Sequence, residues 1–328
     1  MAKRRNKKDK NKLILQLISI ALIFVMSYFG YECTENGGFK NTINKAVSSL
    51  STSSNQTIER KIVDGVMEIH TIDVGQGDSI LVIQKDKVML IDCGTRAKGS
   101  TVVKYLKKLG ITRIDVLVGT HSHDDHMGGM AEIIRNFEIG TLYAPDNSKD
   151  NITTYWYMDF LDAISEKNIN WIYPEVGNMF EIGEANVQIV APNSKEYNNM
   201  NNYSIVLRVT YGETDVLLMG DAETLSEEEI MNNGLYIDVD VLKLGHHGSS
   251  TSSSEKFLNA TTPQYAILSV GKGNTYHHPI KSVMSELENM GIAVYRTDES
   301  GTIVMSTDGK NINFNVEPGD YLSGDELK

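Results

Sequence analysis

The chain has 328 residues, and its 43 Asp and Glu outnumber its 31 Lys and Arg, which gives a formal net charge of −12. This length allows a substantial hydrophobic core, while the acidic balance disfavours a broad basic face of the kind that grips long nucleic acid. The two cysteines, Cys33 and Cys93, lie far apart in the sequence, which disfavours a closed cysteine-rich metal site that only braces the fold.

The N-terminal segments indicate delivery to the cell envelope. Residues 1–12 form a basic leader of net charge +6, and 19 mostly apolar residues follow over 13–31. As a helix this apolar segment extends about 28 Å, close to the hydrocarbon thickness of a bilayer of about 30 Å. We therefore predict a single-pass membrane anchor with the remaining chain outside, the alternative being a cleaved signal and a secreted protein. Residues 32–65, rich in Ser, Thr and Asn, are expected to form a flexible linker.

The folded domain is predicted over residues 66–316. Its first half contains strands over 67–73, 79–84, 88–91 and 116–118 and helices over about 101–109 and 127–136. Gly75 and Gly77 lie between the first two strands and supply the positive φ of a hairpin. Asp73 and Asp78 flank this turn, and we interpret both as residues that could support metal ligands from behind.

The loop after the fourth strand carries three histidines and an aspartate in the order His-x-His-x-Asp-His. Neutral imidazole and carboxylate suit zinc, manganese or iron. His121 and His123 form a pair for one ion, so Asp125 and His126 are assigned to a second ion beside it. Two ions about 3.5 to 4 Å apart can share a hydroxide and clamp the substrate oxygens, which favours hydrolysis.

The second half of the domain places polar residues at strand ends. Strands are expected over 187–190, 205–211, 216–219, 239–242 and 266–269, before a closing hairpin of 301–306 and 312–316. Asp221 follows the third of these strands and is predicted to bridge the two ions, with a turn or helix N-cap as the alternative.

Two histidine pairs follow. His246 and His247 come after a strand, and because adjacent side chains of an extended segment point to opposite sides, we predict His247 as a metal ligand and His246 as a substrate contact, or the reverse. His278 precedes a helix that begins near Pro279, and could donate to a phosphate or carboxylate oxygen. The alternative for His277 and His278 is a surface pair.

Four lysines near these loops could supply local positive charge or belong to the solvated surface: Lys243, Lys256, Lys272 and Lys281. The polar tail over 317–328 is expected to fray.

Taken in order, these motifs resemble those of the metallo-β-lactamase superfamily, and within it the hydrolase domains of ComEC-type competence proteins. The resemblance covers about residues 67–310 and is carried by the segments 70–79, 90–94, 120–129, 201–204, 219–223, 245–249 and 274–279. It implies an α/β fold, an αββα sandwich of two mixed sheets with helices outside and the metal site at the edge where loops gather.

The resemblance also implies a ligand set. By position, the first ion is held by His121 and His123, the second by Asp125, His126 and His247, with Asp221 between them. Asp92 matches an acidic residue that supports the metal loop from behind. Many members supply a third histidine to the first ion, but no histidine occurs between His126 and His246. Asn201 or Ser204 occupies that region as a contact of the first ion or the substrate, which argues against tight binding of two zinc ions.

The sequence thus predicts an extracytoplasmic hydrolase that uses two divalent ions, zinc or manganese, to cleave a phosphodiester in DNA or in a cell-wall polymer. Asp125, His246 and His278 are expected to contact the reacting group. The alternatives are a β-lactamase or another amide or thioester hydrolase, and a non-catalytic metal-containing binding protein of the envelope. The sequence names no protein partner.

Overall fold

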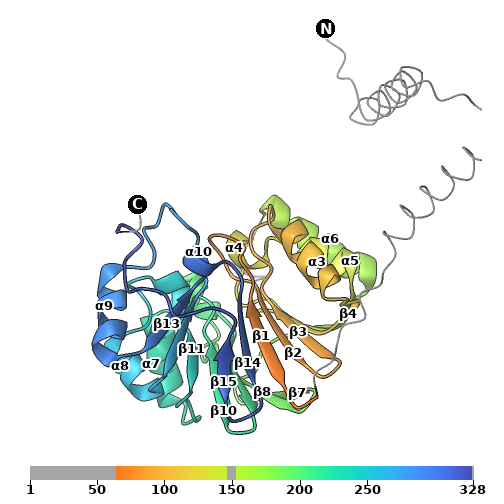
Figure 1. Cartoon of the computed structure of the whole chain (residues 1–328). Coiled ribbons are helices and arrows are strands. Elements are labelled where there is room, and N and C mark those ends of the chain that lie inside the picture. Colours follow the sequence, from red (N-terminus) through yellow and green to blue (C-terminus); the bar gives the residue numbers. More distant parts are fainter. Residues whose placement is uncertain (1–63, 146–152, 327–328) are drawn as a thin grey trace, which may run out of the picture. The chain divides into compact units, whose positions relative to one another are not determined.

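A computed structural model describes residues 64–145 and 153–326, which form two β-sheets packed face to face (Figure 1). The first sheet has the order β15 (Ile312–Phe314), β14 (Ile303–Thr307), β1 (Met67–Thr71), β2 (Ile80–Gln84), β3 (Lys87–Ile91), β4 (Arg113–Val118), β5 (Glu138–Tyr143) and β6 (Trp171–Ile172). The second has the order β13 (Ala293–Arg296), β12 (Tyr265–Leu268), β11 (Val241–Lys243), β10 (Thr214–Leu218), β9 (Val206–Tyr211), β8 (Ala185–Ala191) and β7 (Met179–Ile182). Both sheets mix parallel and antiparallel pairs.

Alternation along the strands assigns each apolar side chain to one of two cores. In β2, Ile80 and Val82 belong to the cluster between the sheets, whereas Leu81 and Ile83 belong to the cluster on the outer face. Successive side chains of a strand point to opposite faces, so a strand that is apolar throughout must be covered on both sides. All five residues of β2 are buried, as this requires.

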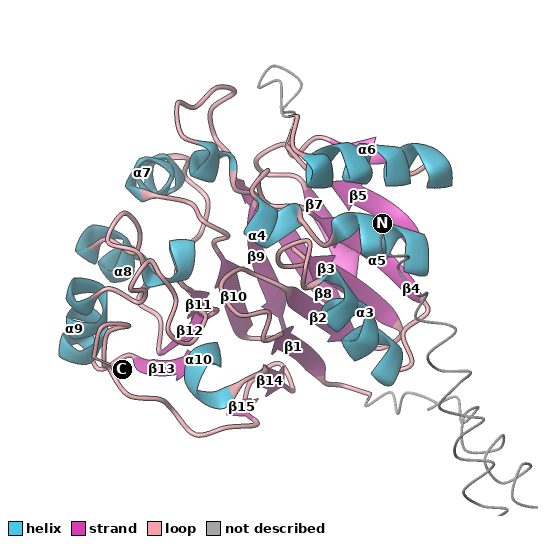
Figure 2. Cartoon of the chain, turned by 90° about the horizontal axis from the view of Figure 1, so that it is seen from above, coloured by secondary structure: helices cyan, strands magenta, loops and turns pink. Residues whose placement is uncertain are grey.

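Helices cover the two outer faces (Figure 2). Over the first sheet lie α3 (Gly99–Lys108), α4 (Asp124–Met127), α5 (Met130–Asn136) and α6 (Tyr155–Lys167). Over the second lie α7 (Thr224–Asn232), α8 (Glu255–Thr261) and α9 (Lys281–Met290), and α10 (Thr297–Ser300) follows β13. The predicted αββα sandwich is therefore confirmed.

The structure differs from the prediction in one helix and in four strands. The helix expected over 127–136 is divided into α4 and α5 at Gly128 and Gly129. A Cβ on Gly128 would lie 2.2 Å from Asp124 Oδ1, and one on Gly129 would lie 2.3 Å from the Cys93 carbonyl oxygen. Tight packing of this turn against its neighbours thus requires the two glycines. The strands β5, β6, β7 and β13 were not predicted.

The C-terminal segment is packed, so the expectation of a frayed tail is wrong for residues 317–326. Gly319 N donates to the Val294 carbonyl (2.8 Å), and Gly324 N donates to the Pro279 carbonyl (2.9 Å). Arg296, which is fully buried, donates to the Leu322 carbonyl. Its guanidinium therefore ties the tail to the end of β13.

The basic leader (1–12), the anchor (13–31) and nearly all of the linker (32–65) lie outside the described residues. Within 64–145 and 153–326, no helix combines the length and the apolar character needed to cross a bilayer.

Candidate metal centre

Polar loops gather at one edge of the two sheets, each after the carboxyl end of a strand. They carry Asp92 after β3, His121, His123, Asp125 and His126 after β4, Asp221 after β10, His247 after β11 and His278 after β12. The pairs β3–β4, β10–β11 and β11–β12 are parallel. Carboxyl ends of parallel strands meet at the same edge of a sheet, which brings these distant residues together.

Four of the predicted ligands converge. The candidate ligand atoms of Asp125, His126, Asp221 and His247 all lie within 4.8 Å of one another. Asp221 Oδ2 is 3.2 Å from His126 Nε2, and Asp221 Oδ1 is 3.5 Å from His247 Nε2. Asp125 Oδ2 is 3.4 Å from His247 Nε2 and 3.8 Å from His126 Nε2. A tetrahedral metal about 2.0 to 2.2 Å from its ligands separates them by about 3.3 to 3.6 Å, so the spacing fits a metal ion.

Hydrogen bonds behind the two imidazoles fix which nitrogen faces this cluster. His126 Nδ1 donates to Asp92 Oδ2 (2.7 Å), and His247 Nδ1 donates to the Ser269 carbonyl (2.8 Å). Asp92 also accepts from Thr120 N and Thr120 Oγ1. In the neutral form of both histidines the Nε2 lone pair is therefore directed inward, as in metal-binding histidines.

The cluster has a surplus of negative charge. Burial opposes protonation, but Asp221 and the neighbouring carboxylates outweigh it, raising the pKa of His247 to about 10 and that of His126 well above its ordinary value. His126 Nε2, His247 Nε2 and Asp221 Oδ1 are buried and make no hydrogen bond within the described part of the chain. A divalent cation would satisfy these atoms and replace the protons, so the residues fit a metal.

His121 and His123 lie beside the four-residue cluster. His121 Nε2 is 2.9 Å from His123 Nδ1 and 3.8 Å from Asp221 Oδ2. Ser204 Oγ is 3.3 Å from His121 Nδ1 and accepts from Asp221 N at 3.0 Å. In the described ranges two groups of three or more candidate ligands occur, Asp125/His126/Asp221/His247 and Asp78/Asp92/His126, and neither includes His121 or His123. The two histidines are thus placed to extend the centre from one side.

Lys243 is buried, which rules out the alternative of a solvated surface residue and leaves that of a local positive charge. Its Nζ lies 2.7 Å from Asp78 Oδ2, and both side chains are 1% exposed. Asp78 Oδ1 is 3.5 Å from His247 Nδ1. Burial would raise the pKa of Asp78, but Lys243 and His247 hold it at about 2. Asp78 therefore lies behind the centre as predicted, with a buried lysine as its partner.

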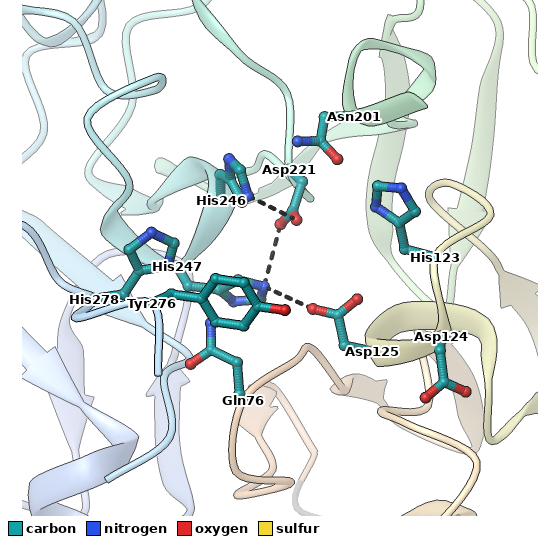
Figure 3. A pocket seen from close by; sticks show the side chains of 10 residues that line it. All are labelled: Gln76, His123, Asp124, Asp125, Asn201, Asp221, His246, His247, Tyr276 and His278. Carbon is teal, nitrogen blue, oxygen red and sulfur yellow. Dashed lines mark ion pairs between the residues drawn. The ribbon is translucent and has the colours of Figure 1, made fainter. Parts of the chain in front are cut away.

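The centre opens into a pocket of about 310 Å³ (Figure 3). It is lined by Gln76, His123, Asp124, Asp125, Asn201, Asp221, His246, His247, Tyr276 and His278. The segment with His246 and His247 is a left-handed turn with φ of 50° and 55°, so the expected extended conformation is wrong. Of the two alternatives for the pair, the geometry favours His247 as the ligand, because His247 is buried in the cluster while the His246 side chain is 24% exposed.

One residue predicted to support a ligand, Asp73, lies elsewhere, and His277 follows its surface alternative. Asp73 is exposed and its carboxylate accepts from Gly75 N (2.9 Å), a turn contact rather than support of a ligand. His277 is 53% exposed and pairs with Asp325 at 2.7 Å. His278, in contrast, lines the pocket, and its Nδ1 is buried without a hydrogen-bond partner among described residues.

Sequence reasoning missed some residues at the site: Gln76, Asp124, Glu223 and Tyr276. Gln76 lies between the two hairpin glycines, and a polar side chain in that turn was the signal that could have identified it. Glu223 lies two residues after Asp221, within the segment 219–223 that carries the resemblance, and was given no role of its own.

Comparison with known proteins agrees with the predicted resemblance. The family model for the metallo-beta-lactamase superfamily matches residues 72–272. The chain is 31% identical over 269 residues to ComE operon protein 3 of Bacillus subtilis (76% of this chain, 34% of that protein) and 34% identical over 233 residues to competence protein ComA of Neisseria gonorrhoeae (70% and 31%). It therefore spans about a third of the length of these relatives. Among solved structures, YhfI from Bacillus subtilis is similar with a TM-score of 0.49 and 14% identity, covering 70% of this chain and 95% of that one.

Proposed function

Because this chain belongs to the metallo-β-lactamase superfamily, a superfamily of metal-dependent hydrolases with ComEC-type competence proteins among its members, we propose that it is a divalent-metal-dependent phosphodiesterase. The observation that carries the proposal is the convergence of Asp125, His126, Asp221 and His247 at an open pocket that three of them line. A closed structural site would not open into a cavity that can admit substrate.

These four residues would hold one zinc or manganese ion, and His121 and His123, with Asp221, would hold a second. When bound, such ions supply positive charge to the substrate oxygens and to the attacking water. Asp92 and Asp78 would support the ligands, since Asp92 accepts from His126 and Asp78 lies beside His247. Asn201 and Ser204 lie on the His121 side of the centre and would complete it there.

His246 and His278 would contact the reacting group. Their rings are 5.5 Å apart and both line the pocket. Burial lowers the pKa of His278 to about 4, so its imidazole is neutral at neutral pH and offers one N–H to a phosphate oxygen. Asn274 holds this loop, because its amide donates to the His278 carbonyl and accepts from His278 N. The two imidazoles thereby face negative charge that develops on the phosphate.

The substrate class rests on two observations that point to different polymers. One relative is named a competence protein, which supports DNA as the substrate. The residues that line the pocket include no Lys or Arg, which supports recognition of a single diester group, as in a cell-wall polymer, over a grip on many phosphates. The anchor proposed over 13–31 would place the domain outside the cytoplasmic membrane, where it could reach either substrate. This location is tested by adding protease to intact cells whose wall has been removed and measuring whether the domain is cleaved.

The test uses the full chain, stripped of metal and reloaded separately with manganese or zinc. The substrates are bis(p-nitrophenyl) phosphate, plasmid DNA and a chromogenic cephalosporin. We expect metal-dependent cleavage of the diester, and we expect Asp221→Asn to reduce it at least about 100-fold. The reason is that the Asp221 carboxylate faces both His121 and His126.

Asp73→Asn is the matched control, since it makes the same change in an exposed turn and should retain wild-type turnover. Cleavage of the cephalosporin alone would instead assign an amide hydrolase. Tight metal binding without turnover of any substrate would leave a binding protein of the envelope.

A further inference from the structure

One carboxylate joins three loops around the pocket. Glu223 Oε1 accepts from Asn201 Nδ2 (2.9 Å) and from Thr251 Oγ1 (3.1 Å), while Oε2 accepts from Asn199 Nδ2 (2.7 Å). The His246 ring is also within reach, with Nδ1 3.4 Å from Glu223 Oε1. The loops that bear Asn201, Asp221 and His246 thus share one acceptor, which is 15% exposed.

The contacts with Glu223 determine how the Asn201 amide is oriented. An ionised carboxylate only accepts hydrogen bonds, so it selects the NH₂ end of Asn201. Asn199 cannot reverse its own amide to compensate, because its Oδ1 already accepts from Asn201 N at 3.0 Å. Asn201 Oδ1 is consequently turned away from Glu223; it is buried and has no hydrogen-bond partner in the described part of the chain. In Figure 3 this oxygen lies on the side of His123.

We propose that Glu223 is a positioning residue that presents the Asn201 amide oxygen to the cation side of the pocket. The inference rests on the proposed function and extends it, since it gives Asn201 a defined role. An ionised phosphodiester has acceptors and no donors, so an amide oxygen cannot bind it directly. The oxygen instead binds a cation beside His121 and His123, in the region that lacks a further histidine. His246 and His278 remain available to donate to the phosphate.

The experiment is a titration of the EDTA-treated full chain with Mn²⁺ alone, followed by calorimetry. Glu223→Leu removes both acceptor oxygens and releases the Asn201 amide, so we expect Mn²⁺ affinity to fall about 10- to 100-fold, as for other groups that orient metal ligands. Asn201→Leu should cause a similar loss, and the double variant should bind no more weakly than Asn201→Leu alone. In the ¹⁵N spectrum, the Asn201 side-chain amide should lose its hydrogen-bonded shift in Glu223→Leu.

Glu228→Leu is the matched control, because Glu228 is exposed on α7, the helix that begins directly after Glu223. Wild-type affinity in Glu223→Leu, or losses that add in the double variant, would overturn the proposal. Should Glu223→Leu fail to fold, two other variants still decide. Wild-type Mn²⁺ affinity in Asn201→Leu would overturn the role of its amide oxygen, whereas Thr251→Val removes another contact of Glu223, leaves Asn201 bound and should keep wild-type affinity. Binding is measured without substrate, so a failure of phosphodiester turnover would not be mistaken for a failure of this inference.

Discussion

Replacing Lys243 by methionine should destabilise the fold severely, although the residue touches no substrate. The ammonium group lies 2.7 Å from Asp78 Oδ2, both side chains are 1% exposed, and Lys243 Nζ also donates to the Leu244 carbonyl (2.9 Å). Removing one partner of a buried ion pair leaves the other charge uncompensated and costs about 3 to 5 kcal/mol. For a domain of this size such a loss lowers the melting temperature by about 2 to 4 °C per kcal/mol, or roughly 6 to 20 °C in all.

The assay is urea unfolding of the metal-free full chain, monitored by circular dichroism, with Lys256→Met as the control on the exposed surface. Asp78→Asn combined with Lys243→Met removes both charges, so this double variant should be more stable than Lys243→Met alone. A double-mutant cycle then isolates the coupling, which we expect to exceed about 2 kcal/mol. A loss below about 1 kcal/mol in the single variant, or strictly additive losses, would refute the assignment of a buried ion pair.

Three further outcomes follow from the same geometry. Lys243 and His247 hold the folded pKa of Asp78 at about 2, below its ordinary 3.8. The ionised carboxylate therefore stabilises the fold by about 2 kcal/mol above about pH 4, and this contribution is lost as the pH falls through 2. Unfolding at pH 2 to 5 should show this loss in the wild type and not in the Asp78→Asn, Lys243→Met double variant. Asp92→Asn removes the acceptor for His126 Nδ1, so metal affinity measured by chelator competition should fall about 10- to 100-fold while Asp73→Asn binds normally. A Cβ on Gly324 would lie 2.3 Å from the His278 carbonyl oxygen, so Gly324→Val should displace that loop and raise KM for bis(p-nitrophenyl) phosphate, with metal affinity unchanged; an unchanged KM would show that the tail does not position His278.

Much of the centre could be predicted because its residues lie in local sequence patterns that indicate their position. Apolar strands that stop at a polar residue mark the edge of a sheet, and His126, Asp221 and His247 each lie shortly after such a stop. Their chemistry also limits the choice, since three histidine clusters in one acidic chain have few structural uses.

The parts that escaped prediction depend on contacts between residues distant in the sequence. Lys243 resembles any surface lysine until Asp78, in the turn between β1 and β2 of the other sheet, is placed against it. The two-residue strand β6 has too few residues to show a period, and it exists because β5 offers a parallel partner. The left-handed turn at His246 and His247 likewise has no local signal, since neither is a glycine.

The centre contains two kinds of compensation for buried negative charge. Asp78 is paired with the Lys243 ammonium group within the fold, whereas the cationic partners of Asp221 in the described part of the chain are imidazoles whose protons a metal ion can replace. The first arrangement keeps the hairpin and β11 together whether or not metal is bound. In the second arrangement, the net charge of the cluster depends on the pH and on the metal concentration. Since a ligand that binds only the folded state stabilises it by about 2.7 kcal/mol at 100 times its Kd, the metal should contribute to the stability of the loops as well as to chemistry.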